Sequence, residues 1–314
     1  MGRKTAEKLT EGIDASNLTI IVTGGTHGLG KETVRVLAKR GAHVYLAARN
    51  LKAAGEVKQQ IVKETASARV DLLKIDLASL ESVRTAAKEF LALNVPLNVL
   101  VCNAGIVSAA VEYSVDGIEM DFATNYLGHF LLTSLLLDKM KETANESGIE
   151  GRIVNVSSHT HEAYPQEGGI KFDEIFRPDK PAVDGTPLGV ALRNYGQSKL
   201  AQILYTKELA KRLQDEGVKN VVVNSLHPGM VRTNLVNQAP SWMKPVINFA
   251  FVTFGLTPAQ GASLQTCLAV SPDVKGITGK YFVDGKEYEL KYKYALDEEL
   301  QKKLWDFSRK FTST

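Results

Sequence analysis

The chain has 314 residues, of which 44% are hydrophobic and 23% charged, a composition that allows an ample globular core. A net charge of only +3 from scattered basic residues argues against a nucleic-acid partner. Two cysteines, Cys102 and Cys267, are too few and too far apart for a metal site or a disulfide framework. The longest apolar run, residues 245–256, falls short of the ~20 residues that a membrane-spanning helix needs, and the N-terminus lacks the core of a signal peptide. We therefore expect a cytoplasmic protein with no transmembrane segment and no bound metal.

A short β-branched strand, residues 19–23, leads into a glycine-rich turn and then into a helical pattern that stops at Gly41. This order favours a phosphate site, because glycines let the backbone approach a pyrophosphate and a helix N-terminus offers free N–H groups. The glycine spacing lacks the later third glycine of the common dinucleotide fingerprint, and a plain tight turn is the alternative. We expect dinucleotide contacts from Gly24, Thr26, His27, Gly28, Leu29 and Gly30.

The second expected strand, residues 43–48, ends in Arg49 and Asn50. An NAD site usually has an acidic residue at this point, whereas the 2′-phosphate of NADP needs a cation. Arg49 therefore favours NADP, the alternative being an arginine that only faces solvent. His27 could donate a second hydrogen bond to the same phosphate.

The third strand, residues 70–75, is followed by Asp76 and Leu77. Residues just past the carboxyl end of a parallel strand line the ligand crevice, so these two are expected near the adenine. Asp76 could equally cap the helix expected at residues 80–91. The fourth strand, residues 97–102, ends at three residues that would let the sheet edge pack against a cofactor ribose: Asn103, Ala104 and Gly105.

A long apolar pattern over residues 120–140 predicts a buried helix that carries Asn125, an amide in need of partners. The fifth strand, residues 151–156, ends near Ser158. Residues 159–194 are rich in proline and glycine and are interpreted as an irregular insert that overhangs the crevice. After a sixth strand at 220–226, the aromatic segment 230–256 could form a lid over an apolar substrate, although core packing explains it equally well.

Tyr195 and Lys199 begin an apolar-periodic segment, which places them on the first turns of a helix. Residues four apart share one helix face, so the phenol and the ammonium lie side by side. A fixed positive charge lowers the pKa of a neighbouring phenol, which suits an acid/base group acting on an alcohol oxygen. The pair alone is a weak signal, since this spacing is common on solvated helices.

Further elements are expected at residues 257–270 (helix), 281–283 (strand) and 297–311 (helix). Strands alternate with helices throughout, and neither an internal repeat nor a composition break divides the chain. We predict one α/β domain, residues 1–314, built on a single doubly wound parallel sheet of the Rossmann type.

In this order along the chain, the motifs resemble the short-chain dehydrogenase/reductase superfamily: Thr23-Gly24-x-x-x-Gly28-x-Gly30, Asn103-Ala104-Gly105, Asn125, Ser158, Tyr195-x-x-x-Lys199 and Pro228-Gly229. The resemblance covers almost the whole chain. Other stretches are most similar to the retinol-dehydrogenase-like group and to plant dehydrogenases of the chloroplast translocon-associated type: Asn125-Tyr126-Leu127-Gly128-His129-Phe130, Leu226-His227-Pro228-Gly229, Gly279-Lys280-Tyr281-Phe282 and Leu304-Trp305. The long interval from Ser158 to Tyr195 is also typical of that group.

The resemblance implies a role for each matching residue. Tyr195 would be the general acid/base, Lys199 would lower its pKa and hold the nicotinamide ribose, and Ser158 would hydrogen-bond the substrate oxygen. Asn125 would anchor a water in a proton relay. The cofactor's nicotinamide end would meet Pro228, Gly229, Val231 and Thr233. His27 stands where many NADP-preferring members have arginine or lysine, so the NADP prediction depends mainly on Arg49.

The leading hypothesis is an NADP(H)-dependent oxidoreductase acting on a fairly apolar carbonyl or secondary alcohol. An alternative is a redox-sensing protein that binds NADP(H) and reports to a membrane complex, with a basic C-terminal helix that could bind a regulator. A nucleotide-sugar epimerase or dehydratase fits less well, because no extra substrate domain is present. Either a monomer or a homodimer is compatible with the sequence, and a chloroplast or membrane-peripheral location is the alternative to the cytoplasm.

Overall fold

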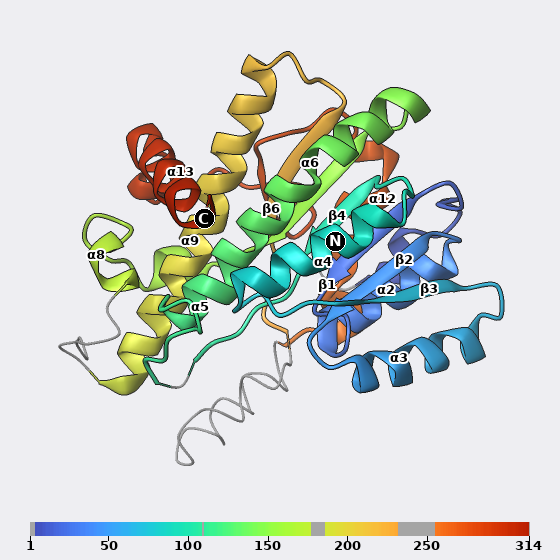
Figure 1. The fold of residues 1–314 in the computed structure, drawn as a ribbon, viewed down its shortest axis with the longest axis horizontal. Helices are drawn as coiled ribbons and strands as arrows, with labels where there is room; N and C mark the ends of the chain where they lie inside the picture. Colours follow the sequence, from blue (N-terminus) through green and yellow to red (C-terminus); the bar gives the residue numbers. More distant parts are fainter. Residues whose placement is uncertain (1–3, 109, 177–185, 232–254, 314) are drawn as a thin grey trace.

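A computed structural model describes residues 4–108, 110–176, 186–231 and 255–313. In this part of the chain, eight strands form one sheet in the order β3-β2-β1-β4-β5-β6-β7-β8, and every neighbouring pair is parallel except β7 and β8 (Figure 1). The chain starts in the middle of the sheet and winds outward in both directions, which confirms the predicted doubly wound α/β fold. The strands are β1 (Thr19–Thr23), β2 (His43–Ala48), β3 (Arg69–Lys74), β4 (Val99–Cys102), β5 (Gly151–Val156), β6 (Val221–His227), β7 (Tyr281–Val283) and β8 (Lys286–Glu287).

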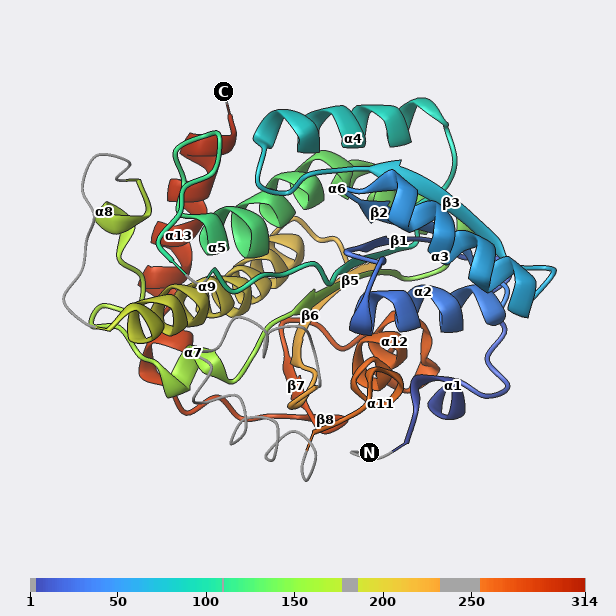
Figure 2. The same cartoon turned by 90° about the horizontal axis from the view of Figure 1, so that it is seen from below.

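Helices cover both faces of the sheet (Figure 2). Alternate strand residues point to opposite faces, so Ile21 and Leu100 enter one core while Ile20 and Val101 enter the other. The first core lies under α4 (Leu80–Ala92), α6 (Gly128–Ser147) and α9 (Pro187–Asp215), and the second under α2 (Gly28–Lys39), α3 (Leu51–Glu64) and α12 (Ser263–Val270). The other α-helices in the described residues are α1 (Ala6–Leu9), α5 (Met120–Phe122), α7 (Thr160–Ala163), α8 (Phe172–Ile175), α11 (Pro258–Gly261) and α13 (Glu298–Thr312).

Side chains that cap the helices explain where several of them begin. Asn50 caps α3 and Ser79 caps α4, each by accepting a backbone N–H of the first turn. The alternative that Asp76 caps α4 is therefore wrong. Its Oδ1 accepts the Ala78 N–H at 3.1 Å instead, in a local turn that precedes the cap.

The segment 159–194 is more regular than the sequence predicts. It contains α7 and α8, and α9 already begins at Pro187, with Thr186 as its cap. Proline suits the first position of a helix, where its missing N–H would have no partner, so a residue interpreted as a loop marker starts a helix. As a consequence, Tyr195 lies in the third turn of α9 and not in its first turns.

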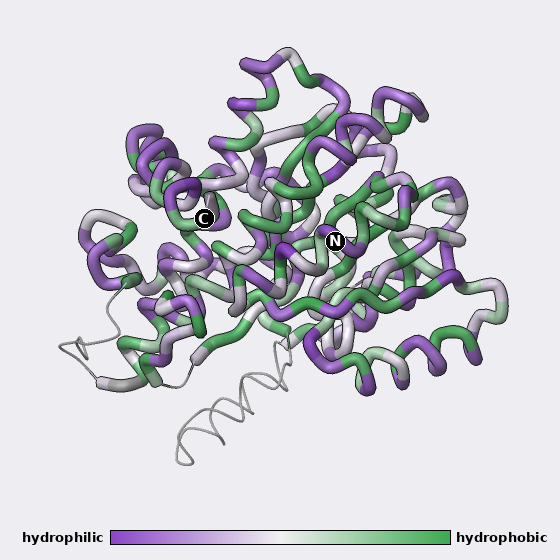
Figure 3. The backbone as a smooth tube through the Cα atoms, in the orientation of Figure 1, coloured by the Kyte–Doolittle hydropathy of each residue, from purple (hydrophilic) through white to green (hydrophobic). Residues whose placement is uncertain are grey.

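The C-terminal helix α13 packs against α6 and α9 through an aromatic cluster. The Trp305 ring lies 5.2 Å from Phe130 and 6.0 Å from Tyr205, and the Arg212 guanidinium covers it at 4.3 Å. The Tyr126 hydroxyl bonds the Ser308 hydroxyl at 2.7 Å. Hydrophobic residues follow the central strands, while many residues of α13 are hydrophilic (Figure 3).

Candidate functional site

The glycine turn after β1 leaves the start of α2 open. His27 occupies the cap position but makes no capping bond, and its Nδ1 lies 2.9 Å from Thr26 Oγ1. The first N–H groups of α2 therefore keep no helical partner, and the helix dipole favours an anion there. At Gly28, with φ of +52°, an added Cβ would meet no atom within 4 Å. An open cradle of free N–H groups fits the pyrophosphate of a dinucleotide.

The other glycines of the turn pack against the residues that follow β4. A Cβ on Gly24 would lie 2.9 Å from the Ala104 Cα, and one on Gly30 only 2.3 Å from the Gly24 carbonyl oxygen. The Thr23 hydroxyl accepts the N–H groups of both Asn103 and Ala104 at 3.0 Å. The structure thus brings together two motifs that stand about 80 residues apart in the sequence.

Arg49 is exposed at the end of β2, and no described residue accepts a hydrogen bond from its guanidinium. Asn50 is engaged as the cap of α3, accepting the Ala53 N–H at 3.1 Å. Leu77 is buried in the core, where its carbonyl packs against Gly128, so the structure does not present its side chain to a ligand. Leu29 is half-buried and packs beside Gly261.

Tyr195 and Ser158 are brought together at the carboxyl end of β5, close enough for the Ser158 hydroxyl to act on the pKa of the phenol. The Ser158 hydroxyl also lies 2.9 Å from that of Thr160. Burial raises the pKa of Tyr195 to about 12, against the opposing effect of the Ser158 hydroxyl. The expected net lowering of this pKa is not met, because burial outweighs the effect of the Lys199 ammonium, which lies 5.4 Å from the ring centre.

Lys199 shares a face of α9 with Tyr195, as predicted, but its ammonium is buried. Only 2% of the residue is exposed, and Nζ donates to the Val156 carbonyl at 2.8 Å and to Gln202 Oε1 at 3.0 Å. Burial lowers the pKa of Lys199 to about 7, partly offset by the negative charge of Asp121. Burial thus favours the neutral form of both the phenol and the amine.

Asn125 lies in a π-helical turn, η1 (Ala123–Leu127), which joins α5 to α6. Its Nδ2 donates to the Ile106 carbonyl and to the Ser198 hydroxyl, both at 2.9 Å, and its Oδ1 accepts the Ile106 N–H at 2.8 Å. Gly105 runs beside it, where a Cβ would lie 3.3 Å from both Asn125 Oδ1 and Lys199 Nζ. A small residue at this point lets the backbone approach the lysine.

Beyond β6, the backbone turns at Gly229, with φ of +86° and Leu256 against the position of a Cβ. Val231 is buried and forms an isolated parallel bridge with Leu256. Pro228 and His227 line a small cavity of about 20 Å³ in the same region. Thr233 and most of the expected lid, residues 232–254, lie outside the described residues.

Comparison with known proteins agrees with this geometry. The model of the short chain dehydrogenase family matches residues 18–169. Short-chain dehydrogenase TIC 32 B, chloroplastic, from Brassica napus is 49% identical over 310 residues, which cover 99% of this chain and 93% of the relative. This chain belongs to the short-chain dehydrogenase family. Human retinol dehydrogenase 14 is 40% identical over 92% of this chain and 84% of its own, which confirms the resemblance to that group.

Among solved structures, an uncharacterised protein from Mycobacterium paratuberculosis matches with a TM-score of 0.73 and 27% identity, covering 100% of this chain and 98% of its own.

No helix among the described residues is long and apolar enough to cross a membrane. In the same residues, no three His, Cys, Asp or Glu side chains gather as potential metal ligands.

Two buried carboxyl groups near the family's acid/base pair were missed by sequence reasoning. Glu119 and Asp121 are 3% and 0% exposed, and burial raises their pKa values to about 8 and about 6, respectively. Asp121 Oδ1 accepts the N–H and the hydroxyl of Ser108, while Oδ2 has no partner among the described residues. Acidic residues at the start of a helix are usually solvated, so the sequence offered no signal of their burial.

Three histidines gather beside Ser158, which was also not predicted. The rings of His159 and His227 lie 4.4 Å apart, and His161 Nδ1 donates to the Ser158 carbonyl at 2.7 Å. Burial, and then the neighbouring imidazoles, lower the pKa of His227 to about 3. His227 therefore packs as a neutral ring behind the serine.

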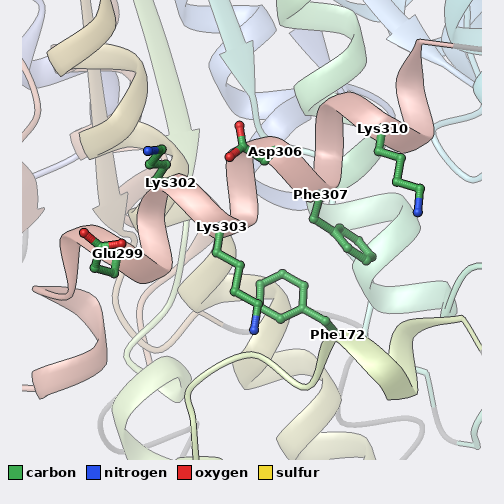
Figure 4. Close-up of a pocket in the computed structure, with 7 residues that line it drawn as sticks. All are labelled: Phe172, Glu299, Lys302, Lys303, Asp306, Phe307 and Lys310. Carbon is green, nitrogen blue, oxygen red and sulfur yellow. The ribbon is translucent and has the colours of Figure 1, made fainter.

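A separate groove of about 490 Å³ lies between α8 and α13, at the opposite end of the molecule from α3 (Figures 1 and 4). The Lys303 ammonium lies over the Phe172 ring at 4.8 Å. The groove mixes both charges with two aromatic rings, and it is lined by Phe172, Glu299, Lys302, Lys303, Asp306, Phe307 and Lys310. It carries part of the basic face that the sequence predicts for the C-terminal helix.

Proposed function

We propose that this short-chain dehydrogenase is an NADP(H)-dependent oxidoreductase acting on a fairly apolar carbonyl or secondary alcohol, with Tyr195 as the general acid/base. The observation that carries the proposal is the proximity of the Tyr195 phenol and the Ser158 hydroxyl, on the same edge of the sheet as the open N-terminus of α2. A bound nicotinamide would supply or accept the hydride.

The protein's own contribution is to position a substrate oxygen and move one proton. Ser158 donates a hydrogen bond to that oxygen, and Tyr195 gives it a proton in reduction or removes one in oxidation. Because burial raises the pKa of Tyr195 to about 12, the phenol holds its proton at neutral pH, which suits the reductive direction. In its ammonium form, Lys199 favours the phenolate that remains after Tyr195 has given up its proton.

For the cofactor, the N–H groups at the start of α2 hold the pyrophosphate and Arg49 binds the 2′-phosphate. An exposed guanidinium with no partner among the described residues is free to form a charge-assisted bond to that phosphate. Asp76 and Asn50 border the adenosine, and the residues beyond β6 border the nicotinamide. In this proposal Arg49 decides the choice of NADP over NAD.

The names of the relatives support an enzyme more than a redox sensor, since both are dehydrogenases. The word "retinol" in one name is compatible with an apolar substrate for this chain. "Chloroplastic" in the other favours the chloroplast alternative, and the cytoplasmic expectation gains no support from these relatives. Either a monomer or a homodimer remains compatible with the proposal.

The test is turnover of a panel of apolar ketones and aldehydes with NADPH, comparing the wild type with Tyr195→Phe. We expect turnover to fall by about a thousandfold, the scale of lost general acid catalysis, with NADPH affinity unchanged within about twofold. Tyr205→Phe is the matched control, because it removes a buried hydroxyl from the same helix and should leave turnover intact. Activity of Tyr195→Phe within tenfold of the wild type would contradict the mechanism. NADPH binding by the wild type without turnover of any carbonyl would favour the sensing alternative.

A further inference from the structure

A buried side-chain amide joins Lys199 to the main chain of the π-helical turn. Gln202 is 1% exposed and stands one turn beyond Lys199 on α9. Its Oε1 accepts the Lys199 ammonium at 3.0 Å and its Nε2 donates to the Asn125 carbonyl at 2.8 Å. An ammonium can only donate and a carbonyl can only accept, so these partners fix the orientation of the amide.

The Asn125 carbonyl has a second side-chain donor. His129 Nδ1 lies 2.9 Å from it, and His129 Nε2 lies 2.8 Å from the Thr23 hydroxyl. Because the carbonyl needs a donor, the proton belongs on Nδ1 and the threonine hydroxyl donates to Nε2. The two side-chain donors use both lone pairs of the carbonyl, so none is left for a water molecule.

We propose that Gln202 is a positioning residue that fixes the Lys199 ammonium and takes the place of the water link to Asn125 that the family resemblance implies. This inference rests on the proposed function of the Tyr195 site. A side-chain amide neither gains nor loses a proton at working pH, so a proton relay through Lys199 ends at Gln202. Asn125 then supports the site as a fixed acceptor and does not pass protons on.

Gln202 also explains how a buried ammonium is tolerated. Desolvation disfavours its charge, and the contacts that compensate are the Val156 carbonyl, the Gln202 oxygen and the field of Asp121. Loss of the Gln202 oxygen removes one of two direct acceptors. Lys199 then releases its proton more readily, and a neutral lysine no longer favours the Tyr195 phenolate.

The test is the pH profile of kcat/KM for alcohol oxidation in Gln202→Met and Gln202→Glu. Methionine has a similar length but no acceptor or donor for these partners, whereas glutamate keeps an acceptor for Lys199 and adds a negative charge. We expect Gln202→Met to lower kcat by about 10- to 100-fold and to move the acid limb about one pH unit upward. Gln202→Glu should return the limb toward the wild-type position. Gln301→Met, which removes another buried glutamine from α13, should leave the profile unchanged.

Two further readouts separate this inference from its alternatives. Wild-type profiles in both Gln202 variants, or equal losses in those variants and Gln301→Met, would overturn the positioning role. The pH dependence of NADPH binding, followed by fluorescence, reports the charge of Lys199 without turnover and should shift to lower pH in Gln202→Met, because Lys199 then releases its proton more readily. If the wild type turns over no carbonyl, the proposed function fails, and an unchanged binding profile would then also overturn the role of Gln202.

Discussion

The glycine turn after β1 and the side-chain network around Lys199 lie at the same edge of the sheet but are built in opposite ways. The turn offers backbone N–H groups to an open space, and its neighbours His27 and Arg49 are exposed. The network is closed, since Lys199 and Asn125 are at most 2% exposed and bound by other protein groups. One region depends on the absence of side chains, and the other depends on a particular set of them.

The two regions are nevertheless connected by hydrogen bonds. The Thr23 hydroxyl holds the strand-to-turn junction at Asn103 and also reaches His129, which shares the Asn125 carbonyl with Gln202. Gln202 in turn holds Lys199. A defect in the turn can therefore reach the lysine through this chain of contacts, or through Ala104 and Gly105, which pack against Gly24 and Lys199.

The largest effect is expected where the turn packs most tightly. Gly30→Ala would place its Cβ 2.3 Å from the Gly24 carbonyl oxygen, so the backbone must shift, and we expect a loss of about 3 kcal/mol in the free energy of unfolding. Gly28→Ala meets no neighbour and is strained only by its φ of +52°, at a cost of about 1 kcal/mol. Urea unfolding of both variants without cofactor measures the difference.

NADPH binding of the same pair sharpens the comparison. Gly28 faces the open cradle, so its alanine variant should remain folded while binding NADPH more weakly. Equal stability of the two variants would contradict the view that Gly30 is a packing glycine and Gly28 a ligand-facing one.

The same contrast decides what the sequence could predict. Some features depend only on residues close together in the chain and on the local periodicities of 2 and 3.6. These are the strands, the glycine turn and the Tyr195–Lys199 spacing. The π-helical turn at Asn125, the burial of Asp121 and the contact of Gln202 with Asn125 depend on packing between segments far apart in the chain. The sequence therefore predicted that Tyr195, Ser158 and Lys199 lie close together, but neither the further partners around them nor how burial changes them.

Tyr195 shows the limit most clearly. A lysine four residues away predicts a lowered pKa, yet burial of the phenol raises it to about 12, while the ammonium donates to Val156 and Gln202. Partners of that kind cannot be read from helical spacing. The cap of α4 is a smaller case, where Ser79 and Asp76 were both chemically suitable and the structure uses Ser79.

Arg49→Ala tests the open region by function. If the guanidinium binds the 2′-phosphate, its loss should raise the KM for NADPH by about 10- to 100-fold, the scale of one charge-assisted hydrogen bond, and should leave the KM for NADH almost unchanged. Steady-state kinetics with both cofactors provide the measurement. Lys52→Ala, three residues further along in the first turn of α3, is a control for general charge and should change neither value much. A constant NADPH/NADH ratio in Arg49→Ala would remove Arg49 from the cofactor site.

The smallest expected effect concerns Lys199 in the closed network and is measured as a change in the free energy of unfolding with pH. The folded-state pKa of Lys199, about 7, lies below that of the unfolded chain, so the unfolded state binds more protons between these values. The free energy of unfolding from this residue therefore rises with pH above about 7, by at most about 1.4 kcal/mol per pH unit. Lys199→Met lacks this titration. The free energy of unfolding of the wild type should therefore rise by about 1 kcal/mol relative to that of the variant from pH 7.5 to 8.5.

Urea unfolding at the two pH values gives that difference directly. Glu119 has a pKa raised to about 8 and contributes an opposite slope, but it does so in both proteins and is largely removed by the subtraction. Lys211→Met replaces an exposed lysine on the same helix. Its free energy of unfolding should change with pH as that of the wild type does. If the Lys199→Met difference is also constant, the ammonium is not penalised by burial, and the contrast between an open turn and a closed network loses its electrostatic basis.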